Sequence, residues 1–140
     1  MRLFLTLLLS AATLAGAAPG NPAPMNGIWK LTALHEAVPD REKLDKSAVQ
    51  LTVVNGQLRG TYSCGRFAGT LAAARNAVQV QIEVLPPKPT ERCPYAVHSA
   101  FHDDLNAATQ YTLSPRYLTM FSKTARLTFE RIGYVTPANK

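Results

Sequence analysis

Residues 49–62 of this 140-residue chain decide its fold, and they read VQLTVVNGQLRGTY. Apolar and polar residues alternate on both sides of Asn55-Gly56, which is the strongest short signal for a hairpin because both residues accept a positive φ. A two-residue turn also fixes the register, and it predicts three opposed pairs: Val53 with Leu58, Leu51 with Gly60, and Val49 with Tyr62. Both strands then direct their apolar residues to one side, as in an antiparallel sheet with one buried face.

The same period of two recurs along most of the chain. In Ala77–Val84, valine and isoleucine alternate with glutamine and glutamate, which indicates a strand with one buried face and one face in water. Similar patterns bounded by turn residues predict further strands over Gly27–Leu34, Phe67–Ala72, Thr109–Leu113, Tyr117–Phe121 and Arg126–Arg131.

One segment has a helical period instead. Four apolar residues follow Pro94 at helical spacing, and proline suits the first position of a helix; they are Val97, Phe101, Leu105 and Ala108. We therefore expect a mainly β (α+β) domain. It should be a single curved antiparallel sheet, or a partly open barrel, of about eight strands with one packed helix.

The start of the chain resembles an export signal. A basic Met1-Arg2 precedes the apolar run Leu3–Leu14, and Ala15-Gly16-Ala17 has the small-x-small form of a cleavage site. Ala17 stands where a lipoprotein would carry its lipid-bearing cysteine, so we expect a periplasmic or secreted protein without a lipid anchor. The predicted organisation is a signal peptide over 1–17, a flexible spacer over 18–25, one domain over 26–132 and a flexible tail over 133–140.

The net charge and the distribution of basic residues limit the kinds of partner that we expect. Loss of Arg2 with the signal peptide lowers the formal net charge from +6 to +5, but the basic residues are scattered and form no run of three. We therefore expect a solvated basic surface, a monomer, no nucleic-acid partner and no membrane-spanning segment in the mature chain.

The only two cysteines, Cys64 and Cys93, predict a disulfide in an exported protein, worth about 3–4 kcal/mol on the chain-entropy model. A structural zinc site would need about four ligands, and only three histidines accompany them.

Few residues suggest chemistry. His98 and His102 are four apart and could chelate a divalent metal from one helix face, but Ser99 stands where a zinc protease would have its glutamate. Both histidines lie one residue off the apolar stripe, so we favour a structural role and expect no metal and no cofactor.

Arg66 could contact carbonyls, a carboxylate or an anionic ligand, and here too we favour a structural role. No nucleophile elbow, paired carboxylates or phosphate loop is present, and we expect no enzyme.

The motif Gly60-x-x-x-Cys64-x-Arg66-Phe67-x-Gly69 resembles the signature of the META domain, the family of the heat-inducible HslJ proteins. Gly65 stands where that signature usually has asparagine. Five further segments follow in the family's order, so that the resemblance covers about residues 26–132: Trp29-Lys30-Leu31, Thr90–Cys93, Phe101-x-x-x-Leu105, Leu118-x-Met120 and Leu127-x-Phe129-x-Arg131. The resemblance implies an envelope or stress-associated role and no established catalytic activity.

We accordingly expect an exported, non-enzymatic, stress-associated envelope protein that binds a protein or a small ligand. The expected binding rim comprises the motif residues and one nearby threonine: Gly60, Cys64, Arg66, Phe67, Gly69 and Thr90. Two alternatives have different partners. A calycin-like carrier would hold an apolar ligand inside the sheet, and an inhibitor would bind a secreted hydrolase.

Overall fold

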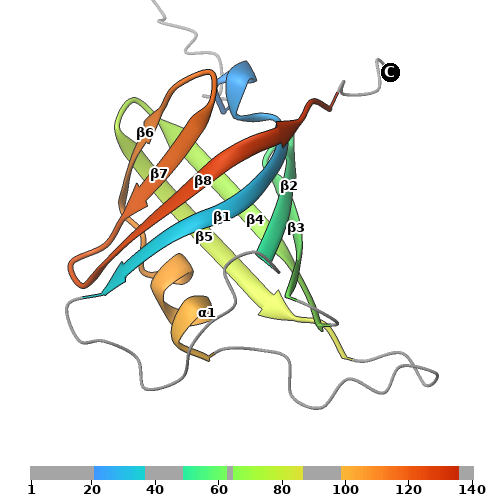
Figure 1. Ribbon diagram of the computed structural model, residues 1–140, viewed down its shortest axis with the longest axis vertical. Coiled ribbons are helices and arrows are strands. Elements are labelled where there is room, and N and C mark those ends of the chain that lie inside the picture. The colour runs from blue at the N-terminus through green and yellow to red at the C-terminus, as the bar shows by residue number, and fades with distance from the viewer. Residues whose placement is uncertain (1–20, 37–48, 63–64, 87–98, 136–140) are drawn as a thin grey trace, which may run out of the picture.

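The computed structural model describes residues 21–36, 49–62, 65–86 and 99–135 (Figure 1). Two helices, the 3₁₀ helix η1 (Ala23–Met25) and the α-helix α1 (Ser99–Asn106), accompany eight strands. The strands are β1 (Gly27–Glu36), β2 (Val49–Val54), β3 (Gln57–Tyr62), β4 (Gly65–Ala74), β5 (Ala77–Val84), β6 (Gln110–Leu113), β7 (Tyr117–Phe121) and β8 (Ala125–Gly133).

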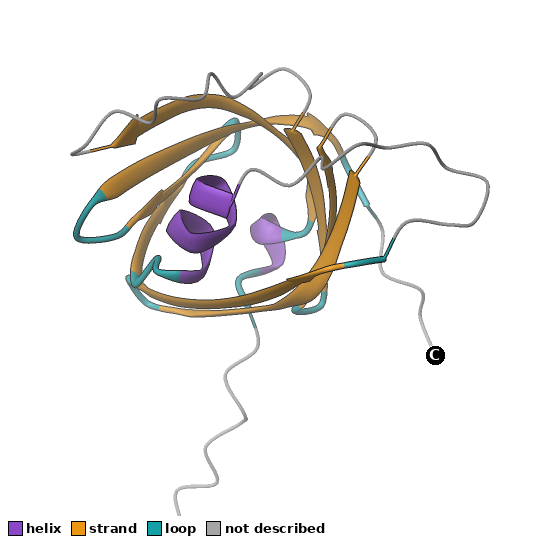
Figure 2. Cartoon of the chain, turned by 90° about the horizontal axis from the view of Figure 1, so that it is seen from below, coloured by secondary structure: helices purple, strands orange, loops and turns teal. Residues whose placement is uncertain are grey.

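The eight strands pair in chain order, all antiparallel, and β8 returns to pair with β1. The sheet therefore closes into a ring, but not into a regular barrel, because β5 and β6 share only the pair Ala77 and Gln110. α1 packs against β5 near this gap and lies within the opening of the ring (Figure 2). The predicted fold class, a curved antiparallel sheet of about eight strands with one helix, is confirmed.

The predicted hairpin is present with the expected register. Val53 lies opposite Leu58, Leu51 opposite Gly60 and Val49 opposite Tyr62. The turn residues Asn55 and Gly56 have φ of 48° and 81°. These are the left-handed conformations that a type I′ turn requires and that Asn-Gly adopts readily.

Several predicted boundaries are wrong by one or a few residues. β1 continues to Glu36, and β4 extends from Gly65 to Ala74. β8 runs from Ala125 to Gly133, so Gly133 belongs to the strand and not to the predicted tail. β6 starts one residue later than predicted, at Gln110. The helix ends at Asn106, and Ala108 is buried just beyond it. Pro94 and Val97, at its predicted start, lie outside the described residues.

The core of the ring consists of inward-facing apolar side chains from every strand and from α1. The largest fully buried side chains are Trp29, Phe67, Phe101, Phe129, Met25, Leu31, Leu51, Leu58, Leu71, Leu105, Leu118 and Met120. At the α1 end, the rings of Tyr62, Phe67 and Phe101 lie 4.6–6.0 Å apart between centroids, in tilted and edge-on contacts. Burial of these aromatic side chains holds the helix against the sheet.

The opposite end is closed by residues Asn21–Asn26, which we call the N-terminal strap. The Asn21 side chain donates to Leu71 O and accepts from Ala73 N, both at 2.7 Å. Met25 is fully buried, and its carbonyl accepts the Trp29 indole N–H at 3.0 Å. The flexible spacer predicted over 18–25 is thus wrong for residues 21–25, which pack on the sheet.

Arg131 of β8 fastens the strap to the ring. Its guanidinium carbon lies 4.2 Å from the centre of the Trp29 ring. Its nitrogens donate to Asn26 O (2.8 Å), to Pro115 O in the β6–β7 turn (2.9 Å) and to Pro24 O. One side chain therefore joins three separate segments at this end of the molecule.

Candidate ligand-binding clefts

The glycines of the Gly60–Gly69 motif shape the sheet. Gly60 lies opposite Phe67, and a Cβ on Gly60 would overlap the Phe67 ring. A Cβ on Gly69 would overlap the backbone carbonyl of Gln81 on β5. Both positions need glycine because a ring or a neighbouring strand occupies the space of a side chain.

The structure also corrects the expected binding rim. Phe67 is only 1 % exposed and belongs to the core, so it cannot contact a partner at the surface. Arg66 Nη2 lies 3.4 Å from Pro86 O, and the Arg66 carbonyl accepts from Leu85 N at 2.9 Å. These contacts join the start of β4 to the end of β5. The remaining expected site residues, Cys64, Thr90, Cys93 and His98, lie outside the described residues.

His102 contacts the edge of β5. Its Nε2 lies 2.8 Å from Ile82 O, and its Nδ1 lies 3.7 Å from an Asp103 carboxylate oxygen. Asn106, one turn along α1, accepts from Ile82 N at 2.8 Å and donates to Ile82 O at 3.2 Å. The two side chains thus satisfy backbone groups of β5 where β6 has diverged. Across the part of the chain that is described, no group of three His, Cys, Asp or Glu side chains could hold a metal ion.

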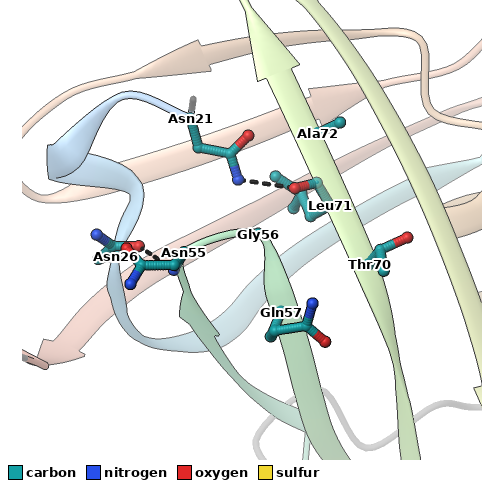
Figure 3. Close-up of a pocket in the computed structure, with 8 residues that line it drawn as sticks. All are labelled: Asn21, Asn26, Asn55, Gly56, Gln57, Thr70, Leu71 and Ala72. Carbon is teal, nitrogen blue, oxygen red and sulfur yellow. Dashed lines mark hydrogen bonds between the residues drawn. The ribbon is translucent and has the colours of Figure 1, made fainter. Parts of the chain in front are cut away.

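A cleft of about 370 Å³ lies where the strap meets the sheet (Figure 3). We call it the amide cleft, because Asn21 and Asn26 of the strap and the turn segment Asn55–Gln57 line it, together with residues 70–72 of β4. Asn26 Oδ1 accepts from Asn55 N at 2.9 Å, and Gly56 O accepts from Leu71 N at 2.9 Å. These bonds, with those of Asn21, fix the walls of the cleft.

Three polar side chains of the amide cleft have no hydrogen-bond partner among the described residues. Asn55, Gln57 and Thr70 are exposed, and their side chains make no hydrogen bond within the described ranges. None of the lining residues is charged. The cleft therefore offers several neutral donors and acceptors at fixed positions.

A second cleft, of about 520 Å³, lies over β4 and β5, and we call it the β4–β5 cleft. It is lined by residues 68–70 of β4, residues 79–83 of β5 and Asn106 of α1. Thr70 belongs to both clefts, so the two adjoin. Glu83 is the one charged lining residue, and no histidine, cysteine, serine or lysine lines either cleft. This composition suits binding better than acid–base or nucleophilic chemistry.

The hydroxyl of Tyr62 is buried inside the ring. Tyr62 is 2 % exposed, and its hydroxyl has no hydrogen-bond partner among the described residues. Burial raises the pKa of this hydroxyl above its ordinary value, because the phenolate would lose its hydration.

Among the residues that line the two clefts, sequence reasoning named Gly69 alone as a site residue. Asn55 was assigned only to the turn, and Asn21 only to the spacer. Gln79 and Gln81 were correctly placed on the water-facing side of β5, but strand alternation does not reveal which side chains of neighbouring strands lie beside them.

Comparison with known proteins adds information about the fold. No protein-family model and no curated protein matches the chain. Its structure is similar to that of a DUF4847 family protein from Bacteroides vulgatus ATCC 8482, with a TM-score of 0.55 and 17 % identity over 76 % of this chain and 92 % of that one. It is also similar to the NMR structure of a protein from Burkholderia xenovorans, with a TM-score of 0.55 and 19 % identity over 91 % and 98 % of the two chains. At these identities the likeness shows a shared fold alone. Neither helix in the described ranges has the length and apolar character needed to cross a membrane.

Proposed function

We propose that this chain is an exported, non-enzymatic envelope protein of the META/HslJ type, and that it acts by binding a partner molecule at the amide cleft. The observation that carries the proposal is the set of polar side chains at Asn55, Gln57 and Thr70. They face a formed cleft, and they make no hydrogen bond within the described ranges. The motif at residues 60–69 supports the family, and the apolar run at residues 3–14 supports export.

The amide cleft is suited to binding because its walls are held in place before a ligand arrives. Four hydrogen bonds of 2.7–2.9 Å fasten the strap, the turn and β4 to one another. A ligand therefore has little chain to order, and preorganisation of this kind raises affinity. Each hydrogen bond that it makes adds about 0.5–1.5 kcal/mol.

A comparative binding experiment tests the proposal. Wild-type protein and the triple variant Asn55→Ala, Gln57→Ala, Thr70→Ala are immobilised and exposed to envelope extract, and retained proteins and glycans are identified by mass spectrometry. We expect a component that wild type retains and the triple variant loses. The variant Gln50→Ala, which alters an exposed glutamine on β2 away from the cleft, should retain it. Equal retention by all three proteins would contradict the proposal.

A second candidate function is a carrier with a ligand inside the ring, and Tyr62 is the observation that favours it. A buried hydroxyl without a partner costs about 1–3 kcal/mol, and an apolar ligand with one hydrogen-bond acceptor would remove that cost. Native mass spectrometry of the protein purified from its own envelope would show such a ligand as an added mass. Its absence there would exclude a tightly held ligand.

A further inference from the structure

The two clefts contain a row of polar side chains that crosses three strands. Gln57 of β3 lies opposite Thr70 of β4, and Thr70 lies opposite Gln81 of β5. All three side chains are exposed and uncharged, and they point to the outer side of the sheet. Because neighbouring strands are about 4.8 Å apart, a hydrogen-bonding group recurs at roughly that interval along the row.

Side-chain size forms a groove along β4, and the row crosses this groove at Thr70. The outward-facing residues on either side of Thr70 are Ala68 and Ala72, which are too small to fill the space above the strand. Longer side chains flank this strand. Gln57 and Gln81 lie on either side of Thr70, and Gln79 lies beside Ala72. Beside Ala68 lie Arg59 on β3 and Glu83 on β5. Small residues form the floor. Amides form the walls beside Thr70 and Ala72, and the two residues of opposite charge, Arg59 and Glu83, flank Ala68.

The chemistry of the groove matches a neutral, polyhydroxylated ligand. Each amide carries a donor and an acceptor on one planar group, and the threonine hydroxyl is also both. Neighbouring hydroxyls of a sugar ring present the same combination. No charged residue lines the amide cleft. At the other end of the groove, Arg59 and Glu83 flank Ala68 with opposite charges, so the groove favours neither an anionic nor a cationic ligand.

A peptide fits these observations less well. Peptides that bind to sheets do so by pairing with an open strand edge. Along the groove, the backbone of β4 is already paired with β3 and β5. Where β4 extends past β3, the Asn21 side-chain amide already bonds Leu71 O and Ala73 N. These are the backbone groups with which an added peptide strand would pair.

We infer that the amide cleft and the β4–β5 cleft form one continuous groove that binds a neutral oligosaccharide chain laid along β4. This inference rests on the proposed binding function and names the class of ligand. The groove has no aromatic lining residue, so the affinity comes from a few hydrogen bonds and a Kd of about 1 mM is expected.

The test is a titration of the full mature chain, labelled with ¹⁵N, with cellotriose, maltotriose and tri-N-acetylchitotriose. The side-chain amide signals of Gln57 and Gln81 should shift with at least one of them. The double variant Gln57→Leu, Gln81→Leu should bind at least tenfold more weakly. The variant Gln50→Leu makes the same change at an exposed position outside the groove and should bind as wild type does.

Three results would overturn the inference. They are no shift with any of the three saccharides at about tenfold the expected Kd, unchanged affinity in the double variant, or amide shifts produced instead by a capped Gly-Ser peptide or by an oligogalacturonate. If the saccharides fail while the Asn55, Gln57 and Thr70 variant still loses its envelope component, the ligand class is wrong and the binding function stands. If both experiments fail, both proposals fall.

Discussion

Arg131 allows the closure of the ring to be tested with one substitution. In Arg131→Ala, the guanidinium that lies against Trp29 is removed, and three backbone carbonyls lose a charged donor. A partly buried cation–π contact is worth about 1–2 kcal/mol. A hydrogen bond to a charged group is worth about 1.5–3 kcal/mol, although such values do not add within one cluster.

The expected loss is smaller than the sum of these contributions. Arg131 is half-buried at the end of the ring, so water can reach Pro24 O, Asn26 O and Pro115 O once the side chain is gone. We therefore expect Arg131→Ala to lower the free energy of unfolding by about 3–4 kcal/mol. The melting temperature should fall by roughly 10–15 °C. Arg131→Lys keeps the charge but not the planar fork, and should lose about half as much.

Urea unfolding, followed by fluorescence, provides the measurement. Trp29 is the single tryptophan and is fully buried, so the same signal also reports release of the strap above it. Arg126→Ala, an exposed arginine on the same strand, is the matched control and should change stability by less than about 0.5 kcal/mol. If the free energy of unfolding of Arg131→Ala lies within about 1 kcal/mol of that of the Arg126→Ala control, Arg131 does not fasten the ring and the reasoning is refuted.

Three further substitutions test other parts of the structure. Tyr62→Phe should leave stability unchanged or raise it by about 1 kcal/mol, because the hydroxyl it removes is buried without a described partner. Since the folded-state pKa of Tyr62 is raised, its contribution to stability is complete below about pH 10 and is lost above it, and Tyr62→Phe should lack this loss in urea unfolding from pH 8 to 11. Gly69→Ala should cost about 3 kcal/mol or more, measured by thermal unfolding, because its methyl group overlaps the Gln81 carbonyl. Asn106→Ala should cost about 1–3 kcal/mol, since Ile82 N loses its partner, and hydrogen exchange at that amide should accelerate.

Controls for these substitutions come from the same chain. The atoms nearest to a Cβ on Gly133 would belong to the Ile28 side chain and not to the backbone, with the shortest contact 3.0 Å from Cδ1, so Gly133→Ala should be milder than Gly69→Ala. Asp103→Ala alters an exposed helix position whose carboxylate lies 3.7 Å from His102 Nδ1, and it should change stability little. A Tyr62→Phe variant that loses more than about 1 kcal/mol would indicate that the hydroxyl has a partner.

The sequence predicted best those features that depend on neighbouring residues. The register of β2 and β3 was correct because a two-residue turn determines it, and β5 was correct because its alternation is unbroken. The ends of β1 and β8 were wrong because each is extended by pairing with the other, about 100 residues away along the chain. Such pairing leaves no local pattern.

The candidate site was predicted poorly for the same reason. Asn21 bonds to residues 50 and 52 positions away, and a short Pro/Ala-rich segment contains no sign of that contact. Phe67 was assigned to a rim because its motif is distinctive, whereas its ring lies over Gly60 in the core. A distinctive motif can therefore reflect packing as readily as binding.

The pairing of β1 with β8 also has a consequence for how the chain folds. β2 to β5 are close neighbours along the chain and can assemble early, whereas the bond from Arg131 to Asn26 spans 105 positions. Contacts of such long separation form slowly, because a large loop must close first. Until it closes, β1 and β8 each present an unpaired edge, which is the usual starting point for aggregation. Refolding should therefore show its slowest phase at ring closure, and its yield should fall as protein concentration rises.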